Sequence, residues 1–541
     1  MLVLKPFLEG DALSTNALVL GGALAVLLLV RMSSSRPKKV FVDKEGNVIK
    51  LRKIHVPKNT LPVLGNLLEV AKNGHRVHDY FTEQCFEFNN EPWTMRIPGQ
   101  PEMLMVSTPE LVEELTTTQF DNFPKGEYLI NLIEDLLGNG LISSDGERWY
   151  HQRKTAVKFF SAKSLRAFMM QSMKKNMQQM YAYLDDAIEK EKTIDLQKLL
   201  HQFTLQTFTE MGLGVELDWI GSEDPHPFER AADEAPPIIA RRSRVPPFVW
   251  KLERWFGIGP EGELRRSMDI LRGWMGDIIQ QSLDNLAKKK AEGKEKVKTD
   301  DDGEEIKSVM ELFADSSRDD VLGLRSEDLV DFIQTFVLAA RDTTAVTLSW
   351  MYYALRDHPE VEKKLYEEIT TKLPQFVGDK DAYLTTDHVR SLTYLEAVIR
   401  ETIRLYPAAP MTHKEAAQDT VIGGDIFVKK GQGVGLLAYA MARSTSIWGC
   451  DATEFKPERW IDPITGEVTP VSSNKWFSFH SGPRVCIGMN LALMELRVLT
   501  ANLLLRYHFE VDPTHPGMYE PALALPIKDP LLTKVHRAPR L

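Results

Sequence analysis

One ten-residue segment, residues 479–488, constrains the fold more than any other part of the chain. It reads FHSGPRVCIG, which is the spacing F-x-x-G-x-R-x-C-x-G. Apolar residues then recur at helical spacing, at Leu491, Met494, Leu496, Leu499 and Leu503. Cys486 therefore stands at the predicted start of a helix, where unpaired backbone N–H groups and the positive end of the helix dipole favour a thiolate.

The residues around Cys486 suit a flat, bulky group that carries negative charge. Gly482 and Gly488 have no side chain, so such a group can approach the backbone closely. Arg484 supplies a cation beside it. A thiolate, two glycines and a cation together favour haem iron with an anionic propionate. A lone cysteine is more often a buried structural residue, but the ten-residue pattern is far more specific than a lone cysteine.

This segment resembles the haem-binding loop of the cytochrome P-450 superfamily. The resemblance implies that the cofactor is haem b and that Cys486 is the axial thiolate ligand of its iron. It also implies that Phe479, Gly482, Arg484 and Gly488 border the haem.

An earlier segment matches a second motif of this family. Trp149 and Arg153 fit the W-x-x-x-R helix, in which both side chains donate towards a haem propionate. A further basic contact is expected from His413 or Lys414, for which the match is looser. By the same resemblance these side chains belong to the cofactor site.

Glu401 and Arg404 lie one helical turn apart. Alone, such an i,i+3 ion pair stabilises a helix by only a few tenths of a kcal/mol. Here, however, it resembles the E-x-x-R helix of the family, and FKPERW at residues 455–460 resembles the P-E-R-F/W segment that follows it. The resemblance implies that Glu401, Arg404 and Arg459 form a buried charge network that braces the haem side of the core. Removing one partner of a buried network leaves the others unpaired, which is costly.

Residues 327–357 form a long predicted helix, some thirty residues without proline or glycine, or roughly 46 Å. Ser326 can cap its start, and His358-Pro359 ends it, because the residue before a proline disfavours the α conformation. Within it, AARDTT at residues 339–344 resembles the oxygen-activation motif A/G-G-x-D/E-T-T of the family.

The resemblance of this motif assigns Asp342 and Thr343 to catalysis and Ala339 to the border of the haem. An acid followed by a hydroxyl can pass protons from solvent to bound dioxygen through water. The alternative for Thr343 is a hydrogen bond to a carbonyl one turn back. Ala340 stands where the family usually has glycine, and we expect its methyl group to narrow the bulge beside the oxygen site.

Most of the remaining chain has apolar residues at helical spacing, and two β-hairpins are predicted at residues 93–106 and 420–428. The predicted fold is mainly α with a minor β-sheet part (α+β), the cytochrome P-450 fold, preceded by one N-terminal transmembrane helix. The expected organisation is a membrane anchor at 1–31, a basic linker at 32–60 and a haem-thiolate monooxygenase domain at 61–541. A hydrophobic content of 43% is ample for one large core.

The expected anchor rests on residues 12–30, which carry no charge and cover roughly 28 Å as a helix, close to the hydrocarbon thickness. Five basic residues follow it, whereas only Lys5 precedes it, which places the rest of the chain on the cytoplasmic side. The alternative, a cleaved signal peptide, lacks its basic start and its small-residue cleavage site. We expect a single-pass protein of the endoplasmic reticulum membrane.

Three isolated cysteines also exclude a disulfide framework.

The resemblance extends from about Leu61 to Arg537. Within the family, the chain looks closest to the long-chain fatty-acid ω-hydroxylase branch. Three segments carry this narrower likeness: residues 145–154, 248–252 with 257–259, and 336–344. It implies hydroxylation of the terminal carbon of long-chain fatty acids with O2. Electrons are expected from a separate NADPH–cytochrome reductase, because no flavin module follows the haem domain. A sterol or terpenoid hydroxylase is the alternative, and a non-catalytic haem or lipid-binding protein is less favoured.

Substrate contacts are inferred from position alone. By the same resemblance, the pocket over the iron is expected to draw on a loop at 120–138, on Phe336 and Ala339, and on residues 408–411 and 522–525. Arg241, Arg242 and Arg244 precede an aromatic stretch, and this basic–aromatic patch either binds a carboxylate or lies on membrane headgroups. The net charge of −10 argues against a nucleic-acid partner.

Overall fold

The computed structural model describes residues 41–42, 45–161, 163–291, 310, 326–379 and 381–538. The chain divides into two compact units, Met1–Arg52 and Lys53–Leu541. In the first unit a β-bridge joins Val42 and Val48. The predicted anchor at 1–31 and the start of the predicted linker lie outside the described residues. Of the helices in the described ranges, none is both long enough and apolar enough to cross a bilayer.

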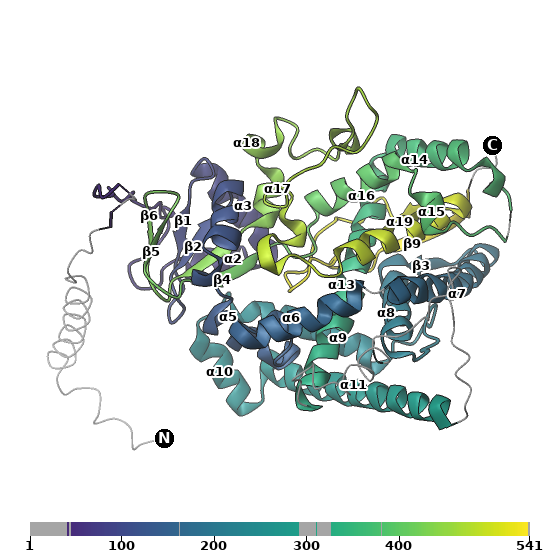
Figure 1. Ribbon diagram of the computed structural model, residues 1–541, viewed down its shortest axis with the longest axis horizontal. Helices are drawn as coiled ribbons and strands as arrows, with labels where there is room; N and C mark the ends of the chain where they lie inside the picture. The colour runs from purple at the N-terminus through teal and green to yellow at the C-terminus, as the bar shows by residue number, and fades with distance from the viewer. Residues whose placement is uncertain are drawn as a thin grey trace, which may run out of the picture. The chain divides into compact units, whose positions relative to one another are not determined.

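Helices make up most of the larger unit (Figure 1). The first half of the chain forms α2 (Leu67–Lys72), α3 (Val77–Glu87), α4 (Pro109–Glu113), α5 (Gly126–Leu137), α6 (Gly146–Ser161), α7 (Lys163–Glu189), α8 (Leu196–Leu213), α9 (Pro227–Arg242), α10 (Pro247–Phe256) and α11 (Gly259–Ala291). The second half forms α13 (Ser326–Asp357), α14 (Pro359–Lys372), α15 (Thr386–Val389), α16 (Thr393–Leu405), α17 (Ala438–Arg443), α18 (Thr445–Trp448) and α19 (Met489–Arg506). Short 3-10 or π turns are η1 (Gly74–Arg76), η2 (Glu114–Thr118), η3 (Phe120–Asn122), η4 (Leu141–Ser143), η6 (Pro374–Phe376), η7 (Pro457–Trp460), η8 (Phe477–Phe479) and η9 (Gly482–Arg484). The expected loop at 120–138 is therefore wrong, because α5 occupies most of it.

Small sheets accompany these helices. Their strands are β1 (Trp93–Met95), β2 (Met103–Val106), β3 (Thr193–Asp195), β4 (Thr412–Glu415), β5 (Thr420–Ile422), β6 (Ile426–Val428), β7 (Gly433–Leu436), β8 (Tyr507–Val511) and β9 (Leu532–Arg537). One sheet has the order β1-β2-β7-β4, with β2 and β7 parallel, and a second has the antiparallel order β3-β9-β8. The hairpins β1–β2 and β5–β6 confirm the two predicted from sequence. A mainly helical fold with a minor sheet part is thus confirmed.

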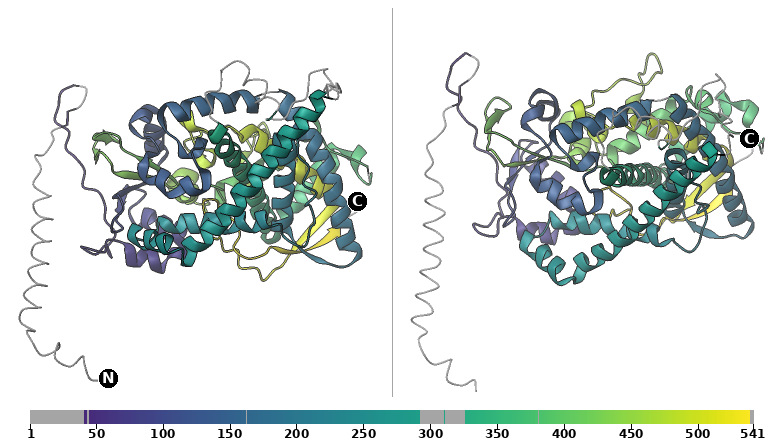
Figure 2. Two further views of the ribbon diagram at one scale, coloured as in Figure 1. Left: turned by 90° about the horizontal axis from the view of Figure 1, so that it is seen from below. Right: turned by 60° about the horizontal axis from the view of Figure 1, so that its bottom comes forward.

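The long predicted helix, α13, lies in the interior of the larger unit (Figure 2). It contacts α8, α16 and α19. Its end at Asp357 and the start of α14 at Pro359 agree with the predicted proline stop. Buried Phe332, Val337 and Trp350 pack into the core, which explains the apolar content of this helix. The helix thereby holds its middle turns, which contain the predicted oxygen motif, inside the protein.

Candidate active site

The loop between η9 and α19 holds Cys486 by its backbone. The Cys486 N–H donates to the carbonyl oxygen of Phe479 at 2.9 Å, and the N–H groups of Gly488 and Met489 donate to the Cys486 sulfur. The thiol is accessible to solvent, yet the surrounding protein is dense enough that burial raises its pKa. The two N–H donors and the guanidinium of Arg153 oppose that rise in pKa. The loop therefore offers a thiol whose ionised form already has three stabilising neighbours.

Glycine occupies two positions of this loop for different structural reasons. Gly482 has φ +64°, and a Cβ there would lie 2.0 Å from the carbonyl oxygen of Thr116 in η2. The close approach of η2 therefore already requires glycine at 482, a reason that the sequence did not indicate. A Cβ on Gly488 would meet only the Cys486 sulfur, at 4.0 Å. Gly488 thus leaves open space beside the sulfur.

Arg484 joins this loop to the start of α6. Its guanidinium donates to Asp145 at 2.5 Å and to the carbonyl oxygen of Ser144 at 3.0 Å, and it lies over the ring of buried Trp149 at 4.4 Å. Burial lowers the pKa of Arg484 to about 10. The negative charge of Asp145 opposes this decrease, and the positive charge of nearby Arg153 adds to it. The structure therefore brings the W-x-x-x-R pair of α6 and the arginine of the cysteine loop together.

Lys125, which sequence reasoning missed, belongs to the same cluster. The backbone N–H groups of Lys125 and Gly126 donate to the Asp145 carboxylate at 3.0 and 2.9 Å. Its ammonium donates to Thr412 in β4 at 3.4 Å. Burial, with Arg484 nearby, lowers the pKa of Lys125 to about 8. The only sequence signal is a Pro-Lys-Gly turn at residues 124–126, which does not indicate what the lysine faces.

The strand β4 adds Lys414, which is fully buried. Its ammonium has no hydrogen-bond partner among the described residues and lies 5.4 Å from the centre of the Phe120 ring. Burial, with Lys125 and Arg484 nearby, lowers the pKa of Lys414 to about 6. The Nε2 atom of buried His413, the other candidate in this strand, also lacks a partner there.

An anionic group with two carboxylates fits this cluster. Lys125, Lys414 and Arg484 surround a single acid, Asp145, and Nζ of Lys414 and Nε of Arg484 have no partner within the described ranges. A buried cation without a partner is costly, and added carboxylates would neutralise it. The chemistry of these donors, beside an accessible thiol, matches the two propionates and the iron of haem.

The middle of α13 separates the two residues of the predicted oxygen motif. The Thr343 hydroxyl donates to the Ala339 carbonyl at 2.8 Å, one turn back, and the residue is exposed. Asp342 instead pairs with Arg341 at 2.6 Å. Burial raises the pKa of Asp342 to about 6, and the guanidinium of Arg341 opposes this rise. The helix stays α-helical through Ala340, so this described segment shows no bulge that its methyl group could narrow.

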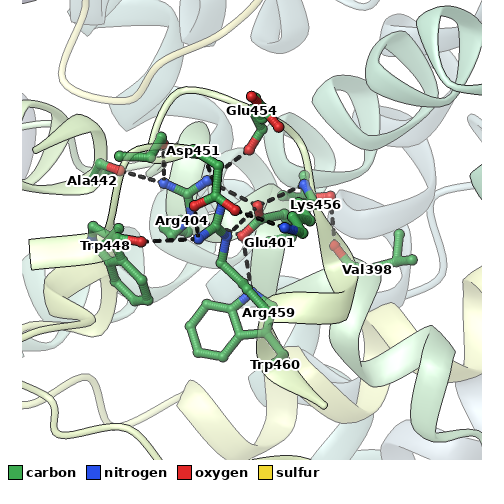
Figure 3. Close-up of polar contacts among 12 residues, drawn as sticks. Val398, Glu401, Arg404, Ala442, Trp448, Asp451, Glu454, Lys456, Arg459 and Trp460 are labelled. Carbon is green, nitrogen blue, oxygen red and sulfur yellow. Dashed lines mark hydrogen bonds and ion pairs between the residues drawn. The ribbon is translucent and has the colours of Figure 1, made fainter. Parts of the chain in front are cut away.

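The predicted charge network is centred on Glu401 of α16 (Figure 3). The Glu401 carboxylate is fully buried and accepts two hydrogen bonds from Arg404, at 2.7 and 2.8 Å. It also accepts from the side chain of Arg459 at 2.9 Å, the backbone N–H of Lys456 at 2.8 Å and the indole N–H of Trp460 at 2.9 Å. Five donors therefore converge on one carboxylate, a strong charge-assisted arrangement.

This network connects to the cysteine loop through aromatic rings. Trp460, which donates to Glu401, lies 5.3 Å from the ring of Trp476, and Trp476 lies 5.5 Å from Phe479. The Ser478 hydroxyl donates to a carbonyl of α16 at 3.0 Å. The network thus braces the residues that precede Cys486.

The three arginines near α10 have different partners. Two of them form two-fold ion pairs with glutamates, Arg241 with Glu253 and Arg242 with Glu261. Arg244 donates instead to two backbone carbonyl oxygens, those of Gly74 and Pro521. Within the described part of the chain, Arg244 alone of the three has no carboxylate partner within ion-pair distance.

Comparison with known proteins agrees with this geometry. A family model described as cytochrome P-450 matches residues 55–533. Cytochrome P-450 704B1 of Arabidopsis thaliana is 32% identical over 509 residues, which cover 88% of this chain and 94% of that protein. Cytochrome P-450 94B1 of the same plant is 30% identical over 483 residues (88% and 90%). Noroxomaritidine synthase of Narcissus aff. pseudonarcissus is 28% identical over 486 residues (88% and 90%).

Proposed function

The chain belongs to the cytochrome P-450 family, whose members are monooxygenases, and we propose that it hydroxylates the terminal carbon of long-chain fatty acids. The observation that carries the enzymatic part is the accessible thiol of Cys486 beside a cluster of cations with too few acids. Support for the substrate is the resemblance of residues 145–154, 248–252 with 257–259, and 336–344 to the ω-hydroxylase branch.

In this proposal haem b, when bound, supplies an iron that activates dioxygen. Cys486 is its thiolate ligand, and the open space beside Gly488 admits the ring. Trp149, Arg153 and Arg484 hold the propionates, joined by the lysines at 125 and 414. Phe479 supports the loop by accepting from the Cys486 N–H.

Asp342 and Thr343 are the proposed proton-delivering pair, at the helix turn that begins with Ala339. Because the Thr343 hydroxyl donates to the Ala339 carbonyl, the lone pairs of its oxygen stay free to accept a hydrogen bond from water. An acid with a pKa of about 6 can both take up and release a proton near neutral pH. The pair thus combines a proton donor with an acceptor that orders water.

Arg244 is the proposed contact for the fatty-acid carboxylate. Arg241 and Arg242 already have carboxylate partners, so a substrate acid would have to displace Glu253 or Glu261. Arg244 donates to the carbonyl oxygen of Pro521, directly before residues 522–525, which are expected to line the pocket. A guanidinium held by neutral carbonyls, on which Glu520 acts without forming an ion pair, gains a direct partner when a carboxylate binds.

The substrate proposal predicts an acid-selective reaction. Reconstituted enzyme, given NADPH and a reductase, should hydroxylate lauric to oleic acids at the terminal carbon, as located by mass spectrometry. Methyl laurate should be a poorer substrate, because it lacks the charge that Arg244 recognises. Arg244→Gln should therefore raise KM for lauric acid about tenfold while leaving KM for methyl laurate nearly unchanged.

Arg241→Gln is the matched control, because its guanidinium already has a carboxylate partner in Glu253. It should leave the ratio of acid to ester turnover unchanged. No turnover of any fatty acid, with good activity on sterols or terpenoids, would contradict the substrate proposal and favour the alternative. Consumption of NADPH without an oxygenated product from a broad lipid panel would favour a non-catalytic lipid binder.

We also propose that the larger unit rests on the endoplasmic reticulum membrane and receives electrons there from an NADPH–cytochrome reductase. Three aromatic side chains of α10 are unusually exposed, Phe248 by 63%, Trp255 by 77% and Phe256 by 64%. Basic residues adjoin this apolar face, which is the composition of an interfacial helix. The uncharged stretch at residues 12–30 supports the same location.

A fluorophore tests this membrane contact in the full chain. Trp255→Cys, in haem-loaded protein with Cys450→Ser, where the proposed bond to iron protects Cys486, is labelled with an environment-sensitive dye and reconstituted into phosphatidylcholine vesicles. We expect a blue shift and strong quenching by spin-labelled lipid, because the aromatic face enters the headgroup region. Ile464→Cys, at a side chain that is 93% exposed on another loop, is the control and should show neither. Equal behaviour of the two labels would contradict the contact.

A further inference from the structure

A hollow of about 250 Å³ adjoins the face of α13 that carries Asp342. Its walls come from α8, α9, α13 and the segment 520–530. Arg341 and Asp342 of α13 line it, together with Lys198 of α8, Asp233 of α9 and exposed Lys528. Thr343 is not among the lining residues. The hollow therefore reaches the proposed acid from the side of α13 that faces α8 and α9.

Within the hollow, Arg341 is shared between two carboxylates. Its Nη1 donates to Asp342 and its Nη2 to Asp233, both at 2.6 Å. The side chain of Arg341 is only 3% exposed, whereas that of Asp233 is 61% exposed. Thr204 of α8 holds the backbone at this point by donating to the Arg341 carbonyl at 2.8 Å. One fixed guanidinium thus links the mostly buried acid to an acid at the surface.

Two adjacent prolines inside α9 give the hollow additional acceptors. Pro236 and Pro237 have no N–H, so the carbonyl oxygens of Ala232 and Asp233, four residues earlier, lose the donor that an uninterrupted helix supplies. All four residues line the hollow. Backbone carbonyls without a helical partner need another hydrogen-bond donor, and water between the charged side chains of the walls can supply it. The lining is thus suited to hold a chain of water molecules.

We propose that protons from solvent enter through this hollow to Asp342, and that Asp233 controls their passage by competing with Asp342 for Arg341. The inference rests on the proposed role of Asp342 and Thr343. Each turnover of a monooxygenase takes up one O2, two electrons and two protons, and places one oxygen atom in the product and the other in water. The electrons come from the reductase. Each proton moves from water in the hollow to the Asp342 carboxylate and on towards Thr343, and solvent replaces it.

The competition follows from the charge of Arg341. If Arg341 paired with Asp342 alone, its positive charge would keep that carboxylate ionised. Proton transfer through Asp342 would then be slower. Asp233 accepts a hydrogen bond from one of the two Nη atoms of Arg341, so the guanidinium stabilises the ionised form of Asp342 less strongly. Asp342 can then accept and release a proton more easily. Arg341 and Asp233 are in this sense positioning residues for the acid.

Asp233→Asn tests the competition, and because this side chain is 61% exposed we expect the variant to fold as wild type does. In reconstituted holoenzyme turning over lauric acid, or any lipid that the enzyme oxidises, hydrogen peroxide released per NADPH should rise at least threefold. The kinetic solvent isotope effect on product formation should also increase. Glu234→Gln is the matched control, because the adjacent acid contacts Ser267 of α11 and does not line the hollow. It should behave as wild type, and equal effects of the two variants would overturn the proposal.

Water access is measured without turnover. In haem-loaded protein with Cys450→Ser, where the proposed bond to iron protects Cys486 and Cys85 is buried, Ala524→Cys lines the hollow and should react readily with a small water-soluble thiol reagent. Ala235→Cys, at a fully buried position of α9, should not react. An inert Ala524→Cys would overturn the water-filled entrance.

Asp342→Asn separates this inference from the role on which it rests. If Asp342→Asn leaves peroxide release unchanged, the proton-delivering role of the pair is wrong. If Asp342→Asn raises peroxide release but Asp233→Asn does not, only the entrance and its control by Asp233 are wrong.

Discussion

Glu401→Gln should lower the free energy of unfolding by about 3–5 kcal/mol, the cost of leaving a buried ion without its partner. The variant replaces a carboxylate that accepts five hydrogen bonds by an amide whose NH2 group faces donors. Arg404, which is 1% exposed, would then keep its charge with no acid of its own. Total stabilities are only about 5–15 kcal/mol, so we expect little soluble holoprotein and a much lower urea midpoint, followed by far-UV circular dichroism.

Glu458→Gln is the control for this prediction. It removes the same charge in the neighbouring turn η7, but its side chain is 43% exposed and pairs with Lys364 at the surface. An exposed pair contributes less than about 1 kcal/mol, so the midpoint should hardly move. Similar midpoints for the two variants would show that the Glu401 network does not stabilise the fold.

The second large effect concerns Cys486. Cys486→Ala should remove the thiolate contact with iron and reduce bound haem to a small fraction of the wild-type content, measured as pyridine haemochrome per mole of protein. Folding should survive, because the hydrogen bond of this loop to Phe479 is made by the backbone N–H rather than by the sulfur. The far-UV spectrum should therefore stay close to that of wild type.

Cys450→Ser is the matched control, since this cysteine is also free and exposed but lies in the turn before Asp451, away from the cluster. It should retain full haem content. Normal haem content in Cys486→Ala would mean that another group holds the iron.

The sequence predicted those features of the fold that depend on motifs of neighbouring residues. The end of α13 follows from His358-Pro359, and the β5–β6 hairpin follows from its glycine pair. The turn of α13 that carries Asp342 was also predictable, because its motif lies within one helix. Each of these depends on residues within a few positions of one another.

Tertiary contacts account for what the sequence did not predict. Gly482 meets η2, more than three hundred residues earlier, and no spacing within the loop indicates this neighbour. Lys125 and Lys414 come from separate segments and meet only because β4 packs against the turn before α5. The pairing of Arg341 with Asp233 joins α13 to α9 in the same way. Such pairings depend on how whole elements pack, which a single sequence does not encode locally.

The most direct test of the central claim is the absorption spectrum of the reduced wild-type protein under carbon monoxide. If the Cys486 sulfur is the ligand of haem iron, the Soret band should shift strongly to longer wavelength, as thiolate ligation requires. A band at the position typical of histidine-ligated haem, from freshly prepared and fully folded protein, would contradict the assignment of Cys486 and the monooxygenase chemistry that depends on it.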